Sequence, residues 1–471
     1  MKRLFSDTLV YGVSNVIGRM ANVFLLPLYA DVFSVSEYGV LSILTVLLAI
    51  ITQLSSLQLE SAVFRFININ STLSATKKTY TTWLFGQLSF SLFLLIGLTL
   101  FKSALSEFLF SDISLSSLLL IGLTVLPLNT FDDLCRSYWR INSKKWHVSI
   151  FNLTTLVLQI ILNYIFLVHY EYGIYSIVWS SLITAILKAI ISILVIKKFI
   201  QLSTFNFEHL KELLKFSIPL VPAGLSIWAL TFMDRIILEK LTGLYDVGIY
   251  QIAITISSVI TLPISAFLFA WTPYVYSILD EPDHRKKIVK IIETFTFVMT
   301  FLGFVCSLFS SELLYLFSDK KFYPSNPLIP ILIFSNILMG LYQLSGIGSA
   351  IAKKTKPVMT STFIATIINL TLNFTLIPSL YAYGASIATL ISYSFIPIFL
   401  FFVSQKFYTL PYNFYKIGGF FIAFFTLSIL VNFYFENFEF NLTYFIIKLI
   451  SSILTSLCLF RYFYKYIKRN I

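Results

Sequence analysis

Long apolar runs, each of about 20 residues, follow one another along almost the whole chain, and only short polar segments separate them. A run of this length crosses the hydrocarbon core of a bilayer as a helix. Strands of an outer-membrane barrel would instead alternate apolar and polar residues over about 10 positions. The pattern predicts an all-α polytopic membrane protein with about fourteen transmembrane helices. The predicted spans cover residues 8–30, 39–65, 79–101, 113–135, 148–168, 173–196, 216–238, 247–277, 291–311, 325–350, 357–378, 382–404, 415–433 and 441–464.

The composition agrees with this class. Hydrophobic residues make up 57% of the 471 residues and charged residues 12%, whereas a soluble domain carries about 25% charge. So much apolar surface excludes a soluble enzyme, a disordered chain and a secreted disulfide scaffold. The three cysteines, Cys135, Cys306 and Cys458, have neither metal nor redox spacing. The four histidines are scattered, so no metal site is predicted.

The formal net charge of +12 would suggest a nucleic-acid partner in a soluble chain. Here most of the 34 lysines and arginines fall on one side when the predicted spans alternate across the membrane, and only Lys102, Lys240, Lys320 and Lys321 lie in loops on the other side. Short cytoplasmic loops are enriched in basic residues. We therefore predict that both termini are cytoplasmic and that the charge reports topology, with no nucleic-acid partner.

Segments of the chain recur at a spacing of about 210 residues, which is the signature of an internal repeat. Ser34–Val40 resembles Gly243–Ile249 and aligns Gly39 with Gly248. Three more pairs follow in order: Asn142–Lys145 with Ala352–Thr355, Leu162–Tyr164 with Leu372–Phe374, and Tyr172–Gly173 with Tyr383–Gly384. The spacing contains six predicted helices, an even number, so the two copies have the same orientation.

The repeat predicts two six-helix lobes, at residues 1–200 and 201–410, followed by two additional C-terminal helices at residues 411–471. Two similar lobes around a central cavity are a common transporter plan, and rocking of the lobes provides alternating access. A duplicated channel or a scaffold is the alternative interpretation of the same repeat.

Several segments carry a resemblance to a known family. They are Ser61–Phe66, Asp234–Leu238, Val247–Tyr250, and the helices of Asn163 and Asn373, each followed by Tyr-Gly. With these segments the chain resembles the polysaccharide-transporter branch of the multidrug/oligosaccharidyl-lipid/polysaccharide (MOP, MATE-like) exporter superfamily, and within it the Wzx-type O-antigen flippases. The resemblance covers nearly the whole chain. At position 58 the chain has a glutamine where the family pattern has a glycine.

The resemblance implies a flippase that moves an undecaprenyl-pyrophosphate-linked oligosaccharide to the periplasmic leaflet of the bacterial inner membrane. The sugar head passes through a hydrophilic, often cationic, cavity between the lobes, and the lipid tail stays among the membrane lipids. The resemblance also implies that the protein is not an enzyme and has no cofactor. A polysaccharide polymerase and chain-length machinery are the implied protein partners.

Arg19 is the foremost candidate site residue, because a charge at membrane depth is a functional hypothesis by default. It lies 11 residues into the first span, about 16 Å at 1.5 Å per residue. Asn15 and Asn22 lie at i−4 and i+3 on the same face. The guanidinium fork binds two phosphate oxygens at once, so we expect this stripe to hold the pyrophosphate or an acidic sugar. The alternative is a buried structural pair with an acidic residue.

Glu60 and Arg65 lie toward the predicted cytoplasmic end of the second span. Arg65 is a candidate to meet the pyrophosphate as it enters, and it is equally a candidate for an interfacial, snorkelling arginine. Glu60 is a candidate for charge balance with Arg19 or for ion coupling.

Asp234 and Arg235 are adjacent near the predicted periplasmic end of the seventh span. Neighbouring residues point about 100° apart on a helix, so one is expected to line the cavity while the other braces the lobe interface. An ion pair at the outer rim is the alternative. Lys188 and Lys448 are weaker candidates, since lysine snorkels readily. Asp132 and Arg136, four residues apart, fit a local helix pair.

Two other functions compete with the flippase. The nearest is a MATE-like drug or cation exporter, which should present net acidic residues in its cavity, whereas here Arg19, Arg65 and Arg235 outnumber Glu60 and Asp234. The second is a membrane-embedded polysaccharide polymerase or ligase, which needs a sizeable extramembrane loop. The chain has short predicted outer loops and no Walker motif. We therefore expect transport to use a proton or sodium gradient, or consumption of the product.

Overall fold

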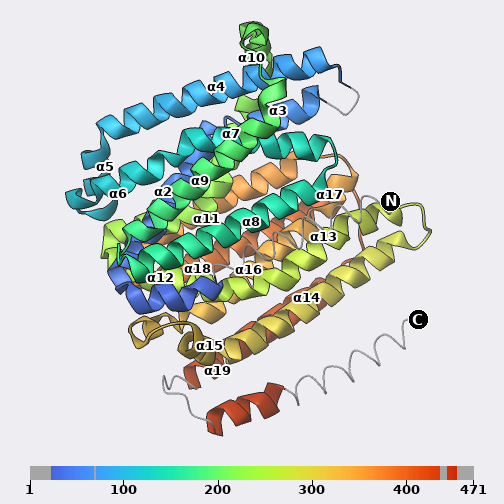
Figure 1. Ribbon diagram of the computed structural model, residues 1–471. Coiled ribbons are helices and arrows are strands. Elements are labelled where there is room, and N and C mark those ends of the chain that lie inside the picture. Colours follow the sequence, from blue (N-terminus) through green and yellow to red (C-terminus); the bar gives the residue numbers. More distant parts are fainter. Residues whose placement is uncertain (1–22, 68–70, 435–442, 453–471) are drawn as a thin grey trace.

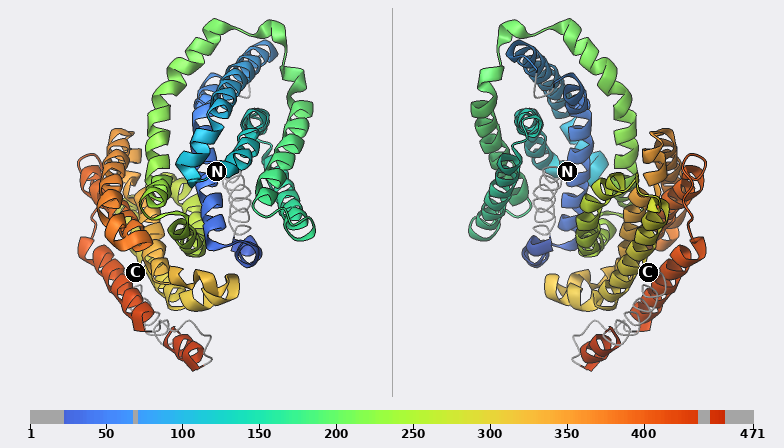
Figure 2. Two further views of the ribbon diagram at one scale, coloured as in Figure 1. Left: turned by 90° about the vertical axis from the view of Figure 1, so that its left-hand side faces the viewer. Right: turned by 90° about the vertical axis from the view of Figure 1, so that its right-hand side faces the viewer.

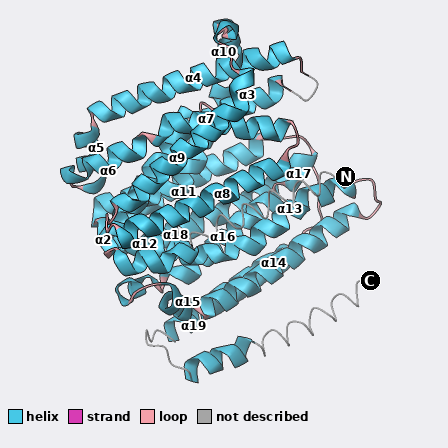
Figure 3. Cartoon of the chain, in the orientation of Figure 1, coloured by secondary structure: helices cyan, strands magenta, loops and turns pink. Residues whose placement is uncertain are grey.

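The computed structural model describes residues 23–67, 71–434 and 443–452, and within these ranges it contains helices and no strand (Figures 1 and 3). The helices of the first half are Val23–Val32, α2 (Val35–Ser55), α3 (Leu59–Phe66), α4 (Leu73–Leu100), α5 (Lys102–Phe110), α6 (Ser116–Leu123), α7 (Val125–Ile141), α8 (Lys145–Tyr164) and α9 (Tyr175–Ile196). Those of the second half are α10 (Phe207–Ser217), α11 (Val221–Thr242), α12 (Leu244–Ser257), α13 (Thr261–Ser277), α14 (His284–Leu308), α15 (Ser310–Phe317), α16 (Leu328–Ser345), α17 (Ile347–Ile351), α18 (Lys356–Ser404), α19 (Phe414–Tyr434) and Thr443–Ser452.

Short 3-10 or π turns link several of these helices. They are η1 (Ile113–Leu115), η2 (Ile165–His169), η3 (Lys197–Phe199), η4 (Leu202–Thr204), η5 (Ile218–Leu220), η6 (Ser258–Ile260) and η7 (Lys320–Ser325). Where such a turn is continuous with its neighbours, as between α10 and α11, the result is one long, bent span.

Eleven of the described helical segments are long and apolar enough to cross a membrane, and the all-α multi-pass fold class is confirmed. The longest, α18, covers two of the predicted spans, which meet where Tyr381 adopts a φ of 52°. Two shorter apolar helices remain: Val23–Val32 overlaps the C-terminal end of the first predicted span, and Thr443–Ser452 lies within the last. The total of fourteen spans therefore stays a prediction.

The ends of the helices follow from local sequence. Ser34 caps α2 in a capping box: its hydroxyl accepts from the Glu37 amide at 3.2 Å, and the Glu37 carboxylate accepts from the Ser34 amide at 2.8 Å. Thr72 caps α4 and Asn206 caps α10 more simply, because each side-chain oxygen accepts from the backbone amide three residues on, at 3.2 Å and 2.7 Å. Gly243, with a φ of 97°, separates α11 from α12, because that backbone conformation favours glycine.

The sequence repeat has a counterpart in backbone geometry. Ser143 and Lys353, which the repeat places in equivalent basic turns, both adopt the left-handed conformation, with φ of 54° and 56°. The residue that follows each of them donates to a carbonyl five residues back, at 2.8 Å in both turns. The lobe boundaries at residues 200 and 410 stay predictions.

Close packing joins the two halves where the N-terminal ends of α2 and α12 cross. A Cβ on Gly39 would overlap the carbonyl oxygen of Leu244 and lie 3.1 Å from its carbonyl carbon. A Cβ on Gly248 would likewise overlap the Val35 carbonyl oxygen and lie 2.9 Å from that carbonyl carbon. The contact is reciprocal between residues that the repeat aligns, and small residues permit such close approach of membrane helices.

Helix α10 fastens the connection between the halves to the N-terminal half. It forms an arch between α9 and α11 (Figure 2). His209 Nε2 lies 2.9 Å from the Thr79 hydroxyl of α4, and its ring meets Phe66 of α3 edge-on. The guanidinium of Arg65 lies 4.6 Å from the centroid of the Phe216 ring. Polar, aromatic and cation–π contacts thus hold α10 against both α3 and α4.

Candidate functional site

A cavity of about 560 Å³ opens among helices of the N-terminal half. Its walls come from α2, α3, α4, α7 and α9, with one residue from α6. The lining residues are Thr45, Leu48, Ala49, Thr52, Gln53, Ser56, Gln58, Glu60, Trp83, Gln87, Gly122, Val125, Leu126, Asn129, Asp133 and Ser181. Most of these side chains are polar although the helices that carry them are apolar overall, which is the pattern of a ligand site within a membrane protein.

A break between α2 and α3 shapes one wall of the cavity. Leu57 and Gln58 adopt left-handed backbone conformations, with φ of 48° and 54°. The Ser56 hydroxyl donates to the Gln53 carbonyl at 2.9 Å and accepts from the Gln58 amide at 3.3 Å. Discontinuous membrane helices often form transporter sites. The left-handed φ also gives a physical reason for the glycine in the family pattern at position 58.

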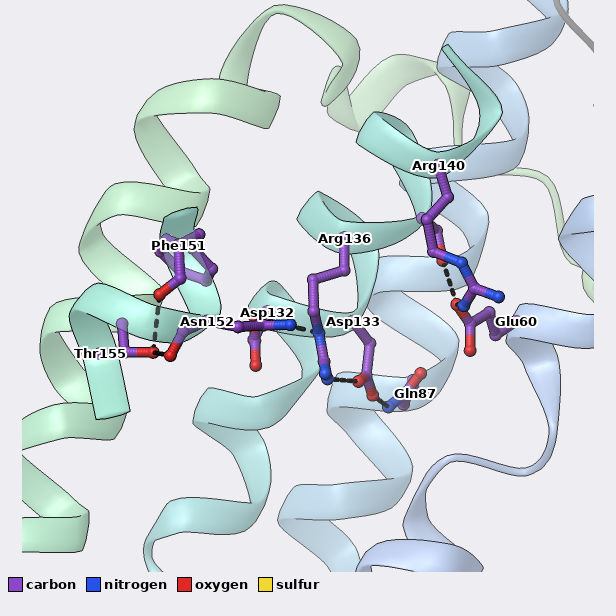
Figure 4. A network of polar contacts seen from close by, with 10 residues as sticks. Glu60, Gln87, Asp132, Asp133, Arg136, Arg140, Phe151, Asn152 and Thr155 are labelled. Atoms are coloured by element: carbon purple, nitrogen blue, oxygen red, sulfur yellow. Dashed lines mark hydrogen bonds and ion pairs between the residues drawn. The ribbon is translucent and has the colours of Figure 1, made fainter. Parts of the chain in front are cut away.

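Both carboxylates on the cavity wall are paired with arginines of α7 (Figure 4). Glu60 Oε1 accepts from Arg140 Nη1 at 2.8 Å and from the Ser137 hydroxyl at 2.8 Å. Asp133 Oδ1 accepts from Arg136 Nη2 at 2.9 Å. Each negative charge on the wall therefore has a positive partner in direct contact.

The network continues behind the wall. Gln87 of α4 donates to Asp133 Oδ2 at 3.1 Å and accepts from the Trp83 indole at 2.6 Å. Arg136 Nε also lies 3.3 Å from Asp132 Oδ1, so the predicted local pair of Asp132 and Arg136 is confirmed. Arg136 thus binds two carboxylates at once, and this forked geometry suits its planar guanidinium.

Other polar side chains on the wall are uncharged. Gln53, Gln58 and Asn129 are half-buried, and their side-chain amides have no hydrogen-bond partner in the part of the chain that the structure describes. Each carboxamide both donates and accepts hydrogen bonds. These three residues are the wall amides that are available to a ligand.

The C-terminal half borders the cavity through α11. A Cβ on Gly224 would lie 3.2 Å from the Gln53 Cδ and 3.4 Å from the Gln58 Nε2. Farther along α2, the Trp228 indole of α11 donates to the Val46 carbonyl at 3.3 Å, and the Ser42 hydroxyl donates to Gln251 of α12 at 2.8 Å. The halves therefore meet along α2 from the edge of the cavity to the glycine crossing.

The predicted site residues fall into separate places. Arg19, Asn15 and Asn22 lie outside the described residues. Glu60 lines the cavity. Arg65 is exposed on α3 and contacts Phe216 of α10. Its position toward the end of the helix is compatible with both roles that the sequence left open.

Asp234 and Arg235 are buried in α11 and do not line the cavity. Asp234 accepts from the Tyr250 hydroxyl at 2.6 Å through Oδ2, and from the Arg235 backbone amide at 2.8 Å through Oδ1. Arg235 lies with its guanidinium carbon 5.2 Å from the centroid of the Phe232 ring. In this conformation the two residues form part of the packing between α11 and α12.

We predict that Tyr250→Phe lowers the stability of the protein by about 1.5–3 kcal/mol, because it removes a donor to a buried carboxylate. Thermal unfolding of the purified protein in detergent measures the change. Tyr164→Phe is the control, since Tyr164 is 56% exposed and its hydroxyl forms no hydrogen bond within the described ranges. Equal melting temperatures for the two variants would show that the Asp234 hydrogen bond contributes nothing.

The two weaker lysine candidates also have structural surroundings. Lys448 Nζ lies 2.9 Å from Glu312 Oε1 of α15, and the lysine is 3% exposed. Lys188 of α9 is half-buried and interacts electrostatically with Asp132 and Asp133. No cluster of three or more His, Cys, Asp or Glu residues suited to a metal ion occurs in the described ranges.

The sequence did not predict that several polar residues line the cavity, namely Gln53, Gln58, Gln87, Asn129 and Asp133. An uncharged amide costs less free energy than a charge to place in an apolar run, so its presence there is weaker evidence for a functional site. Their spacing held a usable signal: Asn129 and Asp133 are four residues apart and share a helix face. The fourth predicted span, 113–135, ends before Arg140, but α7 extends to Ile141 and brings Arg140 to Glu60.

A family model described as polysaccharide biosynthesis protein matches residues 29–325, well over half of the chain. The chain belongs to the polysaccharide biosynthesis protein family. A search of curated proteins found no match. The matched region contains the whole cavity wall and the glycine crossing.

Solved structures of MOP-superfamily transporters share the fold. The lipid II flippase MurJ in an inward closed conformation matches with a TM-score of 0.76 and 18% identity, over 98% of this chain and 99% of that chain. An inward-facing multidrug resistance MATE family transporter matches with a TM-score of 0.69 and 14% identity, over 86% and 98%. A MOP superfamily transporter from Pyrococcus furiosus matches with a TM-score of 0.61 and 16% identity, over 89% and 95%. This family member is therefore a multi-pass membrane protein with a transporter fold.

Proposed function

We propose that this protein is a flippase that moves an undecaprenyl-pyrophosphate-linked oligosaccharide, of an O-antigen or a related surface polysaccharide, across the bacterial inner membrane. The observation that carries the proposal is a polar cavity built into apolar membrane-spanning helices, in a member of the polysaccharide biosynthesis family. The lipid II flippase MurJ, which shares the fold, supports a lipid-linked cargo.

The physical task is to carry a hydrated sugar head past the apolar centre of the bilayer. Removing its hydrogen-bonding groups from water without replacement costs several kcal/mol per group. A cavity lined by amides and hydroxyls replaces those hydrogen bonds, while the lipid tail remains in the bilayer. Rocking of the two halves about the α2–α12 crossing then exposes the cavity to each side in turn.

We assign the charged residues of the sequence to this cycle. Arg19, with Asn15 and Asn22, holds the pyrophosphate or an acidic group of the head. Arg65 meets the pyrophosphate at the mouth, and Arg235 and Asp234 act at the interface of the halves when it opens. Glu60 balances charge or takes part in coupling to a proton or sodium gradient. Both termini are cytoplasmic, and a polysaccharide polymerase with its chain-length machinery takes over the product.

Lipid analysis of a deletion strain tests the function. We expect one lipid-linked repeat unit to accumulate in the cytoplasmic leaflet and surface polysaccharide to be lost. Arg19→Ala should abolish surface polysaccharide while the protein level is unchanged, because the anionic head loses its bidentate partner. Arg19→Lys keeps the charge without the fork and should retain part of the activity. Normal polysaccharide in both the deletion strain and the Arg19→Ala strain would disprove the assignment.

A MATE-like exporter of cationic drugs is the second candidate, and the fold shared with multidrug MATE transporters favours it. Glu60 and Asp133 on the cavity wall would have to bind the cation, and both already pair with arginines. Drug susceptibility of the deletion strain separates the two functions: an exporter predicts sensitisation to cationic drugs with surface polysaccharide intact.

A further inference from the structure

The cavity wall has a charge balance that bears on what it binds. Glu60 and Asp133 are its two carboxylates, and each lies within 3 Å of an arginine nitrogen, of Arg140 and Arg136 respectively. Those arginines are thereby already engaged. A free carboxylate entering the cavity would have to compete with Glu60 or Asp133 for them, and it would do so close to like charge.

The groups left for a ligand are uncharged and bifunctional. Gln53 projects from α2, Gln58 from the break between α2 and α3, and Asn129 from α7, so they reach the cavity from different elements. None of the three amides has a hydrogen-bond partner in the described ranges. Thr52 and Ser181 add hydroxyl groups to the same wall. Sugar hydroxyls and acetamido groups also donate and accept hydrogen bonds, so they can pair with the amides of the wall.

We propose that this cavity is a binding site for the uncharged part of the cargo, a neutral hexose or N-acetylhexosamine unit, and that Gln53, Gln58 and Asn129 determine this specificity. The volume of about 560 Å³ falls within the usual range for small-molecule sites. The proposal rests on the proposed flippase function and narrows it. The cavity selects sugars without a carboxylate, and recognition of the pyrophosphate occurs elsewhere.

Two probes of equal length test the selection. One is a prenyl-pyrophosphate-linked disaccharide of N-acetylglucosamine and glucose, and the other carries glucuronic acid in place of glucose. Binding to the full-length protein in lipid nanodiscs is measured by thermal shift, and translocation is measured in proteoliposomes. We expect the neutral probe to bind about tenfold more tightly, a difference of about 1.4 kcal/mol, because the glucuronate carboxylate must compete with Glu60 and Asp133 for their arginines.

Substitutions on the cavity wall test whether its amides cause the preference for the neutral probe. Asn129→Leu and Gln53→Met keep side-chain volume but remove the amides, and each should weaken binding of the neutral probe about two- to tenfold. Asn152→Leu is the matched control, because Asn152 is a half-buried amide of α8 that does not line the cavity. Asn129→Arg adds a cation on the helix face of Asp133, in excess of the two wall carboxylates, and should shift preference toward the glucuronic acid probe. That gain cannot result from poor folding.

The outcomes separate the inference from the function. Binding of the neutral probe without translocation would support the cavity assignment and overturn the flippase. Translocation of both probes with equal affinity would support the flippase and overturn the selection. Selection that is unchanged in Asn129→Leu, Gln53→Met and Asn129→Arg would overturn the placement of the site. Absence of binding by either probe would overturn both.

Discussion

Gly39→Ala is expected to abolish transport, because it forces apart the two halves where α2 and α12 cross. The added Cβ would overlap the Leu244 carbonyl oxygen, and a backbone carbonyl in a helix cannot turn aside as a flexible side chain can. Overpacking of a well-packed contact typically costs about 1–3 kcal/mol. That cost shifts the population of the conformation described here by about fivefold to more than a hundredfold. Gly248→Ala should act in the same way against Val35.

Disulfide trapping measures the crossing directly. Ser42 and Gln251 lie side by side across the halves, with 2.8 Å between their side-chain oxygens. The pair Ser42→Cys and Gln251→Cys, with the three native cysteines replaced by alanine, should oxidise readily and should do so much less when Gly39→Ala is added. Gly97→Ala is the control, since a Cβ there meets nothing within 4 Å. Undiminished cross-linking and transport in Gly39→Ala would show that α2 and α12 can accommodate the added methyl group without a loss of stability.

Arg136→Met is the second substitution with a large expected effect. Arg136 is the shared partner of Asp132 and Asp133, and Asp132 is 5% exposed. Removing one member of a buried ion pair costs about 3–5 kcal/mol because a charge is left uncompensated. The Arg136 side chain keeps 38% of its surface exposed, so we expect about 2–3 kcal/mol after screening. The loss should appear as a lower melting temperature in detergent and a lower yield of folded protein.

A neutralised variant distinguishes charge from packing. Asp132→Asn and Asp133→Asn combined with Arg136→Met leave no uncompensated carboxylate in the network and should recover most of the lost stability. Arg140→Met is the control for a more exposed pair, because its partner Glu60 has a 40% exposed side chain, and we expect at most about 1 kcal/mol. If the loss of stability in the triple variant equals the sum of the losses from Arg136→Met and from the two Asp→Asn substitutions, Arg136 stabilises the protein through packing alone.

Hydrophobic pattern alone was enough to predict the fold class. Apolar length decides whether a segment spans a bilayer, so the predicted spans from 39–65 to 415–433 coincide with described apolar helices. The sequence repeat aligned Gly39 with Gly248 as equivalent residues, and the structure brings their two helices into reciprocal contact at these positions. The residue types at Leu57 and Gln58 did not predict the backbone break, because neither favours a left-handed conformation; only the glycine of the family pattern at position 58 pointed to it.

The site was harder to predict than the fold. Charges such as Glu60 stand out in an apolar run, and Glu60 does line the cavity. Its partner Arg140 comes from a helix about 80 residues away, and sequence spacing does not report such tertiary pairs. The same holds for Asp234, whose hydrogen bond to Tyr250 depends on how α11 packs against α12.

The attachment of α10 limits how the halves can move. On one side α10 is fastened to α3 and α4 through His209 and Phe216. On the other side α11 packs into the C-terminal half, and between them lies only the 3-10 turn Ile218–Leu220. Three residues of 3-10 helix rise about 6 Å. So short a turn can absorb a change in angle but adds almost no length, so at this connection the halves can tilt against each other but cannot slide apart.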